Sequence, residues 1–168
     1  MVGGSGEKFL LRVVARHADW WNYVWKGPEA YAHKQEVLKG HCRDVGRDYD
    51  AIEQVVRVGI LIAETEREVE RLKTSPGIRS LNDIQLVGTP AQVTEAMLGI
   101  VKQGARRPTV NFADVPRPEG TWLFASTVHH RRNRGAARLA RGAGDGIVLA
   151  VVVGRGLGPQ ASDQLDGL

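Results

Sequence analysis

The chain of 168 residues contains a single cysteine and few aromatic residues, and its apolar runs are short. One cysteine, Cys42, excludes an intramolecular disulfide and a zinc site built from cysteines, and it is consistent with a reducing cytoplasm. The longest apolar run, residues 147–153, is far shorter than the roughly 20 residues that span a bilayer. No signal peptide opens the sequence. These absences predict a soluble, cytoplasmic protein with no membrane partner.

The excess of positive charge is small and uneven. The formal net charge is +4, and residues 127–168 carry most of it, with six arginines against three aspartates. The arginine-rich stretch 129–141 suggests a nucleic-acid-binding patch as one alternative, because such runs bind phosphate backbones. However, no aromatic residues alternate with these arginines and no zinc-finger spacing is present. We therefore expect no nucleic-acid partner.

The first residues of the chain carry the clearest chemical signal. Three glycines, Gly3, Gly4 and Gly6, surround Ser5, and Lys8 stands two positions after Gly6. Glycines let a backbone turn sharply and approach a ligand closely. The apolar residues that follow recur at helical spacing, so the loop leads into a helix whose first N–H groups are free to bind an anion. This pattern predicts a phosphate-binding loop, although a flexible linker is the alternative.

The rest of the chain alternates between helical and extended patterns. The segment Asp19, Trp20, Trp21, Asn22 suits a strand end that faces a ligand, and packing of the two tryptophans is the alternative. Helices are expected over 28–45, 66–73 and 89–103, strands over 54–63 and 108–113, and a loop over 74–87. His33 and His41 are eight residues apart, a spacing that does not favour a metal site. Such alternation indicates an α/β fold with a parallel sheet.

Several segments together resemble the luciferase-like monooxygenases, flavin- or deazaflavin-dependent oxidoreductases with a TIM-barrel fold. These are GGSGEK, ADWWN, HKQEVLKGHCRDVGRDYDAIE, VGILIAETERE, LVGTPAQV and VNFADVPRPEGTWLFA, and the resemblance covers residues 2–125. The order of the segments matches the C-terminal elements of that family, particularly its coenzyme F-420 branch. The resemblance therefore implies the C-terminal half of a (β/α)8 barrel over residues 1–125.

The resemblance also implies a cofactor and its site. Gly3, Gly4, Ser5 and Gly6 would bind the cofactor phosphate, with Lys8 as an electrostatic contributor, and Asp19, Trp20, Trp21 and Asn22 would lie near the ring or the barrel mouth. The implied cofactor is coenzyme F-420, with FMN as the alternative, and the implied reaction is hydride transfer to, or monooxygenation of, a small organic substrate. No metal is implied, and no catalytic acid or base is identified.

Two departures from the family set further expectations. Members are about twice as long, so we expect a truncated fragment that needs an N-terminal half-barrel or a homo-oligomer to complete it, because a few strands cannot close a barrel. After residue 125 the family pattern gives way to a basic tail, 126–168, rich in glycine, alanine and arginine. We expect this tail to be irregular, disordered or translated out of frame. A non-catalytic remnant is the remaining alternative.

Overall fold

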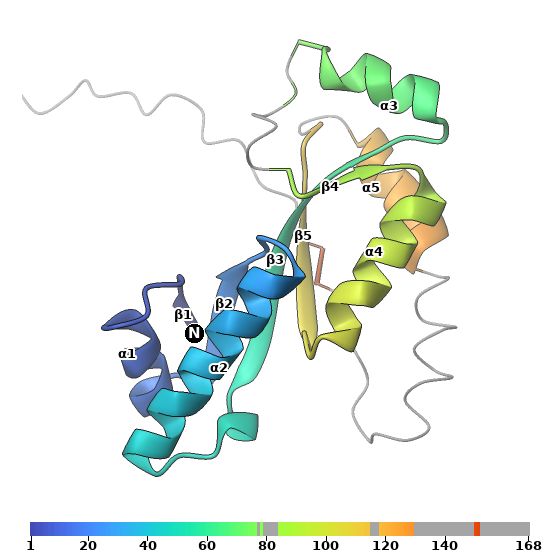
Figure 1. The fold of residues 1–168 in the computed structure, drawn as a ribbon. Coiled ribbons are helices and arrows are strands. Elements are labelled where there is room, and N and C mark those ends of the chain that lie inside the picture. The colour runs from blue at the N-terminus through green and yellow to red at the C-terminus, as the bar shows by residue number, and fades with distance from the viewer. Residues whose placement is uncertain (77, 79–83, 115–117, 130–149, 152–168) are drawn as a thin grey trace, which may run out of the picture.

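The computed structural model describes residues 1–76, 78, 84–114, 118–129 and 150–151 (Figure 1). The predicted alternation of helices and parallel strands is confirmed. The elements are β1 (Val2–Gly3), α1 (Leu10–His17), β2 (Trp20–Val24), α2 (Pro28–Val45), a 3-10 turn (Tyr49–Ala51), β3 (Glu53–Ile62), α3 (Glu66–Lys73), β4 (Leu86–Gly88), α4 (Pro90–Lys102), β5 (Arg107–Phe112), α5 (Glu119–Leu123), a π-helical turn (Phe124–His129) and β6 (Ala150–Val151).

All strand pairs of the sheet are parallel, and β3 is its long central strand. Along the main path the order is β1, β2, β3, β5 and β6, and the short β4 also pairs with β3. On β3, residues 53–57 pair with β2 and residues 60–62 pair with β4, while residues 55–60 pair with β5. Because β5 takes the other edge, β2 and β4 follow one another along a single edge of β3.

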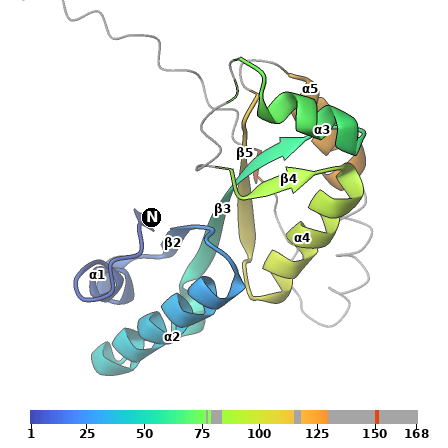
Figure 2. The same ribbon diagram turned by 45° about the horizontal axis from the view of Figure 1, so that its top comes forward.

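Helices cover one face of this sheet, as two views show (Figures 1 and 2). A single apolar cluster joins β3 to α1, α2, α4 and the π-helical turn, and its members from β3 proper are all even-numbered: Val56, Val58, Ile60 and Ile62. Side chains of a strand alternate between the two faces. The odd-numbered residues of β3, among them Arg57, therefore point to the opposite face. We call this opposite side the polar face.

Aromatic residues fill the part of the core between β2 and α2. Trp21 and Tyr31 are fully buried, with their ring centroids 6.0 Å apart and nearly parallel, and Tyr23 packs beside both. The Tyr31 hydroxyl donates to Gln54 Oε1 at 2.6 Å, so the buried polar group has a partner. Burial raises the pKa of Tyr31 far above its ordinary value, and the phenol stays neutral. The cluster fixes α2 against the sheet.

The helix boundaries follow the residues that were expected to set them. α2 has Pro28 in its first turn, and it ends at Gly46, which adopts a left-handed φ of 68°. In α4 the backbone N–H of Thr89 donates to Gln92 Oε1 at 2.8 Å, the interaction expected of a capping box. None of the helices in the described part of the chain is long and apolar enough to cross a membrane.

One expectation needs correction. The segment 74–87 is not wholly a loop, because its last residues begin β4. Within the expected tail, 126–168, Val128 is fully buried in the core cluster, and Ala150–Val151 pairs with Thr109 and Val110 of β5. Helix formation continues across the expected boundary because Phe124 and Val128 are apolar residues four apart, which places them on one helical face. The other residues expected to form the tail lie outside the described part.

Candidate functional site

The glycine loop, residues 3–6, leaves the carboxyl end of β1 and requires glycine at one position. Gly4 has a φ of 129°, and a Cβ added there would lie 2.8 Å from Leu10 Cδ1. The loop is anchored to β2 from both sides, since the Gly4 N–H donates to the Asn22 carbonyl at 3.0 Å and Trp21 Nε1 donates to the Gly4 carbonyl at 2.9 Å. Any larger residue at position 4 would strain the backbone and displace Leu10.

Backbone N–H groups gather where the glycine loop enters α1. The first backbone bonds of this turn are donated by Leu11 to the Gly6 carbonyl and by Val13 to the Phe9 carbonyl, both at 3.0 Å. Within the described residues, the N–H groups of residues 5–9 have no protein acceptor. No side chain caps the helix, and its first turn carries no acidic residue. Free donors at the positive end of a helix form an anion-binding site.

α2 braces the glycine loop through Glu7. The Glu7 carboxylate pairs with Lys34 and, at 3.0 Å, with His33 Nε2, and the Glu7 carbonyl lies 2.7 Å from His41 Nε2. Hydrogen bonds from Lys34 and then His33 lower the pKa of Glu7. Both histidines of α2 thus contact Glu7, the residue that follows the glycine loop. No cluster of metal-binding side chains occurs among the described residues.

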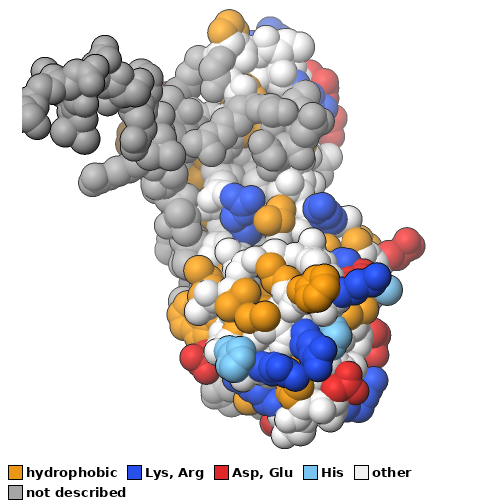
Figure 3. All heavy atoms as spheres, turned by 90° about the vertical axis from the view of Figure 1, so that its left-hand side faces the viewer, with side chains coloured by type: hydrophobic (Ala, Val, Ile, Leu, Met, Phe, Trp, Pro, Cys, Tyr) orange, Lys and Arg blue, Asp and Glu red, His pale blue; other side chains and the backbone are white. Residues whose placement is uncertain are grey.

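Lys8 lies on the concave surface that the loop forms with α2. Ser5, Gly6, Leu10 and Lys34 line the same surface, and Phe9 beside them is 82% exposed. Figure 3 views the molecule from this side and shows basic, histidine and apolar side chains close together. Of the predicted residues, Ser5, Gly6 and Lys8 line this surface, and Gly3 and Gly4 form the strand end and the bend that lead into it.

The segment Asp19–Asn22 is divided by the structure. Asp19 precedes β2, and Trp20, Trp21 and Asn22 are the first three residues of that strand. Asp19 and Trp20 stand at the amino end of β2. The exposed Asp19 carboxylate has its Oδ1 3.7 Å from Arg47 Nη2. The Arg107 guanidinium lies over the Trp20 ring, 4.7 Å from the ring centroid. Trp21 is buried in the aromatic cluster.

Asn22 is the member of the segment that lies nearest the glycine loop. It is opposite Gly3 in the strand register, and its Oδ1 is buried without a partner in the described part of the chain. Asn22 and Trp21 therefore contact the glycine loop through the backbone and the indole N–H, whereas Asp19 and Trp20 contact Arg47 and Arg107 instead. In the parallel register Gly3 lies opposite Asn22, the middle residue of β2, whereas Asp19 and Trp20 lie nearer the amino end of that strand.

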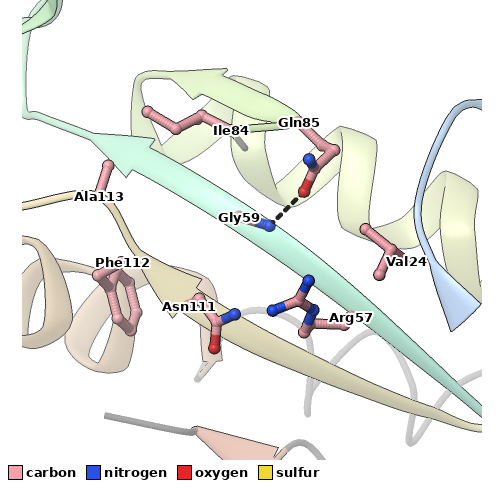
Figure 4. Close-up of a pocket in the computed structure, with 8 residues that line it drawn as sticks. All are labelled: Val24, Arg57, Gly59, Ile84, Gln85, Asn111, Phe112 and Ala113. Carbon is pink, nitrogen blue, oxygen red and sulfur yellow. Dashed lines mark hydrogen bonds between the residues drawn. The ribbon is translucent and has the colours of Figure 1, made fainter. Parts of the chain in front are cut away.

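A second cavity lies on the polar face, where β2 has ended on the edge of β3 and β4 has not yet begun. Gln85 bridges this gap: its side-chain Oε1 accepts from the Gly59 N–H at 2.7 Å, and its backbone N–H donates to the Gly59 carbonyl at 2.9 Å. A cavity of about 140 Å³ remains beside it. Figure 4 shows the side chains of Arg57 and Asn111 next to one another there. Sequence reasoning missed this cavity, although an arginine within a β-branched strand was a visible signal.

The sequence and the structure were compared with those of known proteins. No protein-family model and no curated protein matches the sequence. Among solved structures, EDTA monooxygenase from Chelativorans sp. BNC1 is similar over 80% of this chain and 44% of its own, with a TM-score of 0.62 and 17% identity. The coenzyme F-420-dependent tetrahydromethanopterin reductase from Methanopyrus kandleri is similar over 77% of this chain and 49% of its own, with a TM-score of 0.58 and 14% identity.

Riboflavin lyase, solved with modified FMN and riboflavin, is similar over 79% of this chain and 42% of its own, with a TM-score of 0.62 and 14% identity. The fold is that of the luciferase-like oxidoreductases. The chain spans less than half the length of these three neighbours, so the described sheet corresponds to part of their TIM barrel. In the luciferase-like fold the carboxyl ends of the strands surround the active site. The glycine loop lies at that end, because it follows β1.

Proposed function

We propose that this chain supplies the phosphate-binding part of a luciferase-like oxidoreductase that uses coenzyme F-420 or FMN. The observation that carries the proposal is the run of free backbone N–H groups from residue 5 to residue 9, at the carboxyl end of a strand and the start of a helix. A phosphate oxygen accepts several such bonds at once, and the helix dipole favours its charge. Both cofactors carry a phosphate on a ribityl chain.

The residues present fit a phosphate group. The loop supplies donors, and Glu7, the acidic residue that follows it, is already paired with Lys34 and hydrogen-bonded to His33. The absence of a Cβ at Gly4 permits the bend that exposes the donors. The cofactor, when bound, supplies hydride transfer or oxygen activation. This chain's residues would bind and orient its phosphate end: the amides of 5–9 directly, Ser5 through its hydroxyl, and Lys8 through its charge.

A complete cofactor site would require residues beyond those of this chain. Because it spans less than half of the similar barrels, we propose that a second half-barrel, in the same protein, in a partner or in another copy, completes the walls around the cofactor ring. The substrate of such an enzyme would be a small organic molecule. The arginine-rich stretch that suggested nucleic-acid binding lies outside the described residues, and a non-catalytic remnant is the competing account.

Titration of the ¹⁵N-labelled full chain with FMN and with riboflavin tests the proposal, because the two ligands differ only in the phosphate. We expect FMN to shift the amide resonances of residues 5–9 in a saturable way, with weak affinity, and riboflavin to leave them unmoved. Equal shifts with both ligands would contradict a phosphate site. Binding of FMN below about 1 μM, worth about −8 kcal/mol, would contradict the need for a second half-barrel.

A matched pair of variants tests the role of the backbone. Gly4→Ala places a Cβ 2.8 Å from Leu10 at a positive φ, whereas Gly6→Ala places one at an ordinary 3.6 Å from the same residue. We expect Gly4→Ala to abolish the FMN-specific shifts and Gly6→Ala to retain them. Circular dichroism of both variants is the control for folding. If both variants bound FMN equally, the exposed N–H groups would not depend on the loop geometry.

A further inference from the structure

The polar face carries two arginines in very different surroundings. Arg107 at the start of β5 donates from Nε to Glu53 at 2.9 Å and stacks on Trp20. Arg57 in the middle of β3 has no ion pair or hydrogen bond from its side chain among the described residues. Glu53 is the single acidic residue of β2, β3 and β5, and Arg107 already occupies it. Arg57 is therefore a positive charge without a counter-charge on its own sheet.

The surroundings of Arg57 are those of a small polar binding site. Its guanidinium and the Asn111 side chain line the 140 Å³ cavity together with Val24 and Ala113, and Gly59 leaves the strand beneath without a side chain (Figure 4). Gln85 holds the edge of the cavity open through its two bonds to Gly59. An arginine fork beside a side-chain amide suits a carboxylate, which accepts two parallel N–H bonds.

The position of the cavity connects it to the proposed cofactor site. β1, β2 and β3 are neighbours in the sheet, and adjacent strands lie about 4.8 Å apart, so Arg57 is displaced by about 10 Å from the strand that ends in the glycine loop. Val24 and Ala113, which line the cavity, stand at the carboxyl ends of β2 and β5. A ligand in this cavity would therefore lie toward the carboxyl ends of the strands, as would a cofactor bound by the glycine loop.

We infer that Arg57 and Asn111 form a subsite for the carboxylate of the substrate. The inference rests on the proposed oxidoreductase function and adds the substrate class, a small organic acid. Completion of a barrel around this face would bury the guanidinium, and a buried charge is costly without a partner. The carboxylate supplies that partner, with Arg57 as its bidentate donor and the Asn111 amide as a further donor.

The test is an NMR titration of the ¹⁵N-labelled full chain with sodium acetate, at constant ionic strength set by sodium chloride. The Gly59 N–H lies in the cavity and reports on it. We expect acetate to shift the Gly59 amide in a saturable way, and Arg57→Gln to weaken this binding about tenfold or more, because the charged donor of the carboxylate is lost. Arg57→Lys should recover part of the affinity, and Asn111→Ala should lose part of it.

Arg67→Gln is the control, because it removes the same charge from an exposed position on α3. Two results would overturn the subsite: equal weakening of acetate binding by Arg67→Gln and Arg57→Gln, or no saturable shift of the Gly59 amide up to high acetate concentration. The partner of Arg57 would then be an acidic residue of the completing half-barrel. Inorganic phosphate, which reports on residues 5–9, separates the two proposals: failure of acetate with success of phosphate refutes only this inference.

Discussion

The two faces of the sheet differ in chemistry, although the same strands form both. The covered face carries Trp21, Tyr31 and Val58 in one apolar cluster with the helices. The polar face carries Asn22, Arg57 and Asn111, which are partly or fully exposed. Burial of the first set stabilises the fold, whereas in the second set Asn22 Oδ1 is buried without a partner among the described residues. The contrast shows that the apolar packing of the described sheet is concentrated on the covered face.

Adjacent tryptophans give the largest expected difference between the faces. Trp21→Ala removes a fully buried ring from the core and should cost about 3–5 kcal/mol of unfolding free energy, as large-to-small core substitutions do. Trp20→Ala removes a ring that is 40% exposed and should cost about 1 kcal/mol or less. Urea denaturation followed by circular dichroism measures both. Equal losses would mean that the polar face contributes as much to folding as the covered face does.

Truncation tests where the covered face ends. A chain that stops at residue 129 retains Phe124 and Val128, which are fully buried, whereas one that stops at residue 123 loses both. The ring of Phe124 packs edge-on against Phe112 at 5.6 Å. We expect the shorter chain to lose several kcal/mol, about 3–5 for the phenylalanine alone, and the longer chain to keep the helical signal of the full protein. Loss of structure in the 1–129 chain would show that later residues, such as β6, are needed.

Acid should loosen the glycine loop before it unfolds the covered face. Because Lys34 and His33 lower the pKa of Glu7 in the folded chain, the stability from this carboxylate is present above its unfolded pKa and is lost as pH falls through the folded pKa. We expect the amides of residues 5–9 to shift in that acidic range in the native protein and to be insensitive there in Glu7→Gln. An unchanged titration in the variant would disprove that Glu7 anchors the loop.

The smallest effect is expected at Lys8. Its side chain is exposed and solvated, so Lys8→Ala should weaken FMN binding by about 1 kcal/mol or less. Gly4→Ala should remove much more, because it disturbs the backbone donors themselves. Comparison of the two dissociation constants by FMN fluorescence decides between a backbone site and a charge site. A larger loss at Lys8 would favour the charge.

Sequence reasoning succeeded where local chemistry determines structure. Helix ends are set by local interactions at Pro28, Gly46 and the Thr89–Gln92 pair. The glycines at positions 4 and 6 predicted a turn, and Gly4 has a positive φ. It failed where strand partners decide. The sequence did not show that Trp20 stands at the amino end of β2, and the cavity at Arg57 lies where β2 and β4 leave a gap on one edge of β3. Such information lies in pairing between distant segments.

The central claim is that the free N–H groups of residues 5–9 bind phosphate, and inorganic phosphate tests it most directly. The ¹⁵N-labelled chain is titrated with sodium phosphate at fixed pH, with sodium chloride compensating the ionic strength. The account predicts saturable, concerted shifts of these five amides that Gly4→Ala abolishes and Gly6→Ala retains. Shifts spread over lysine and arginine residues elsewhere, with none at residues 5–9, would contradict it.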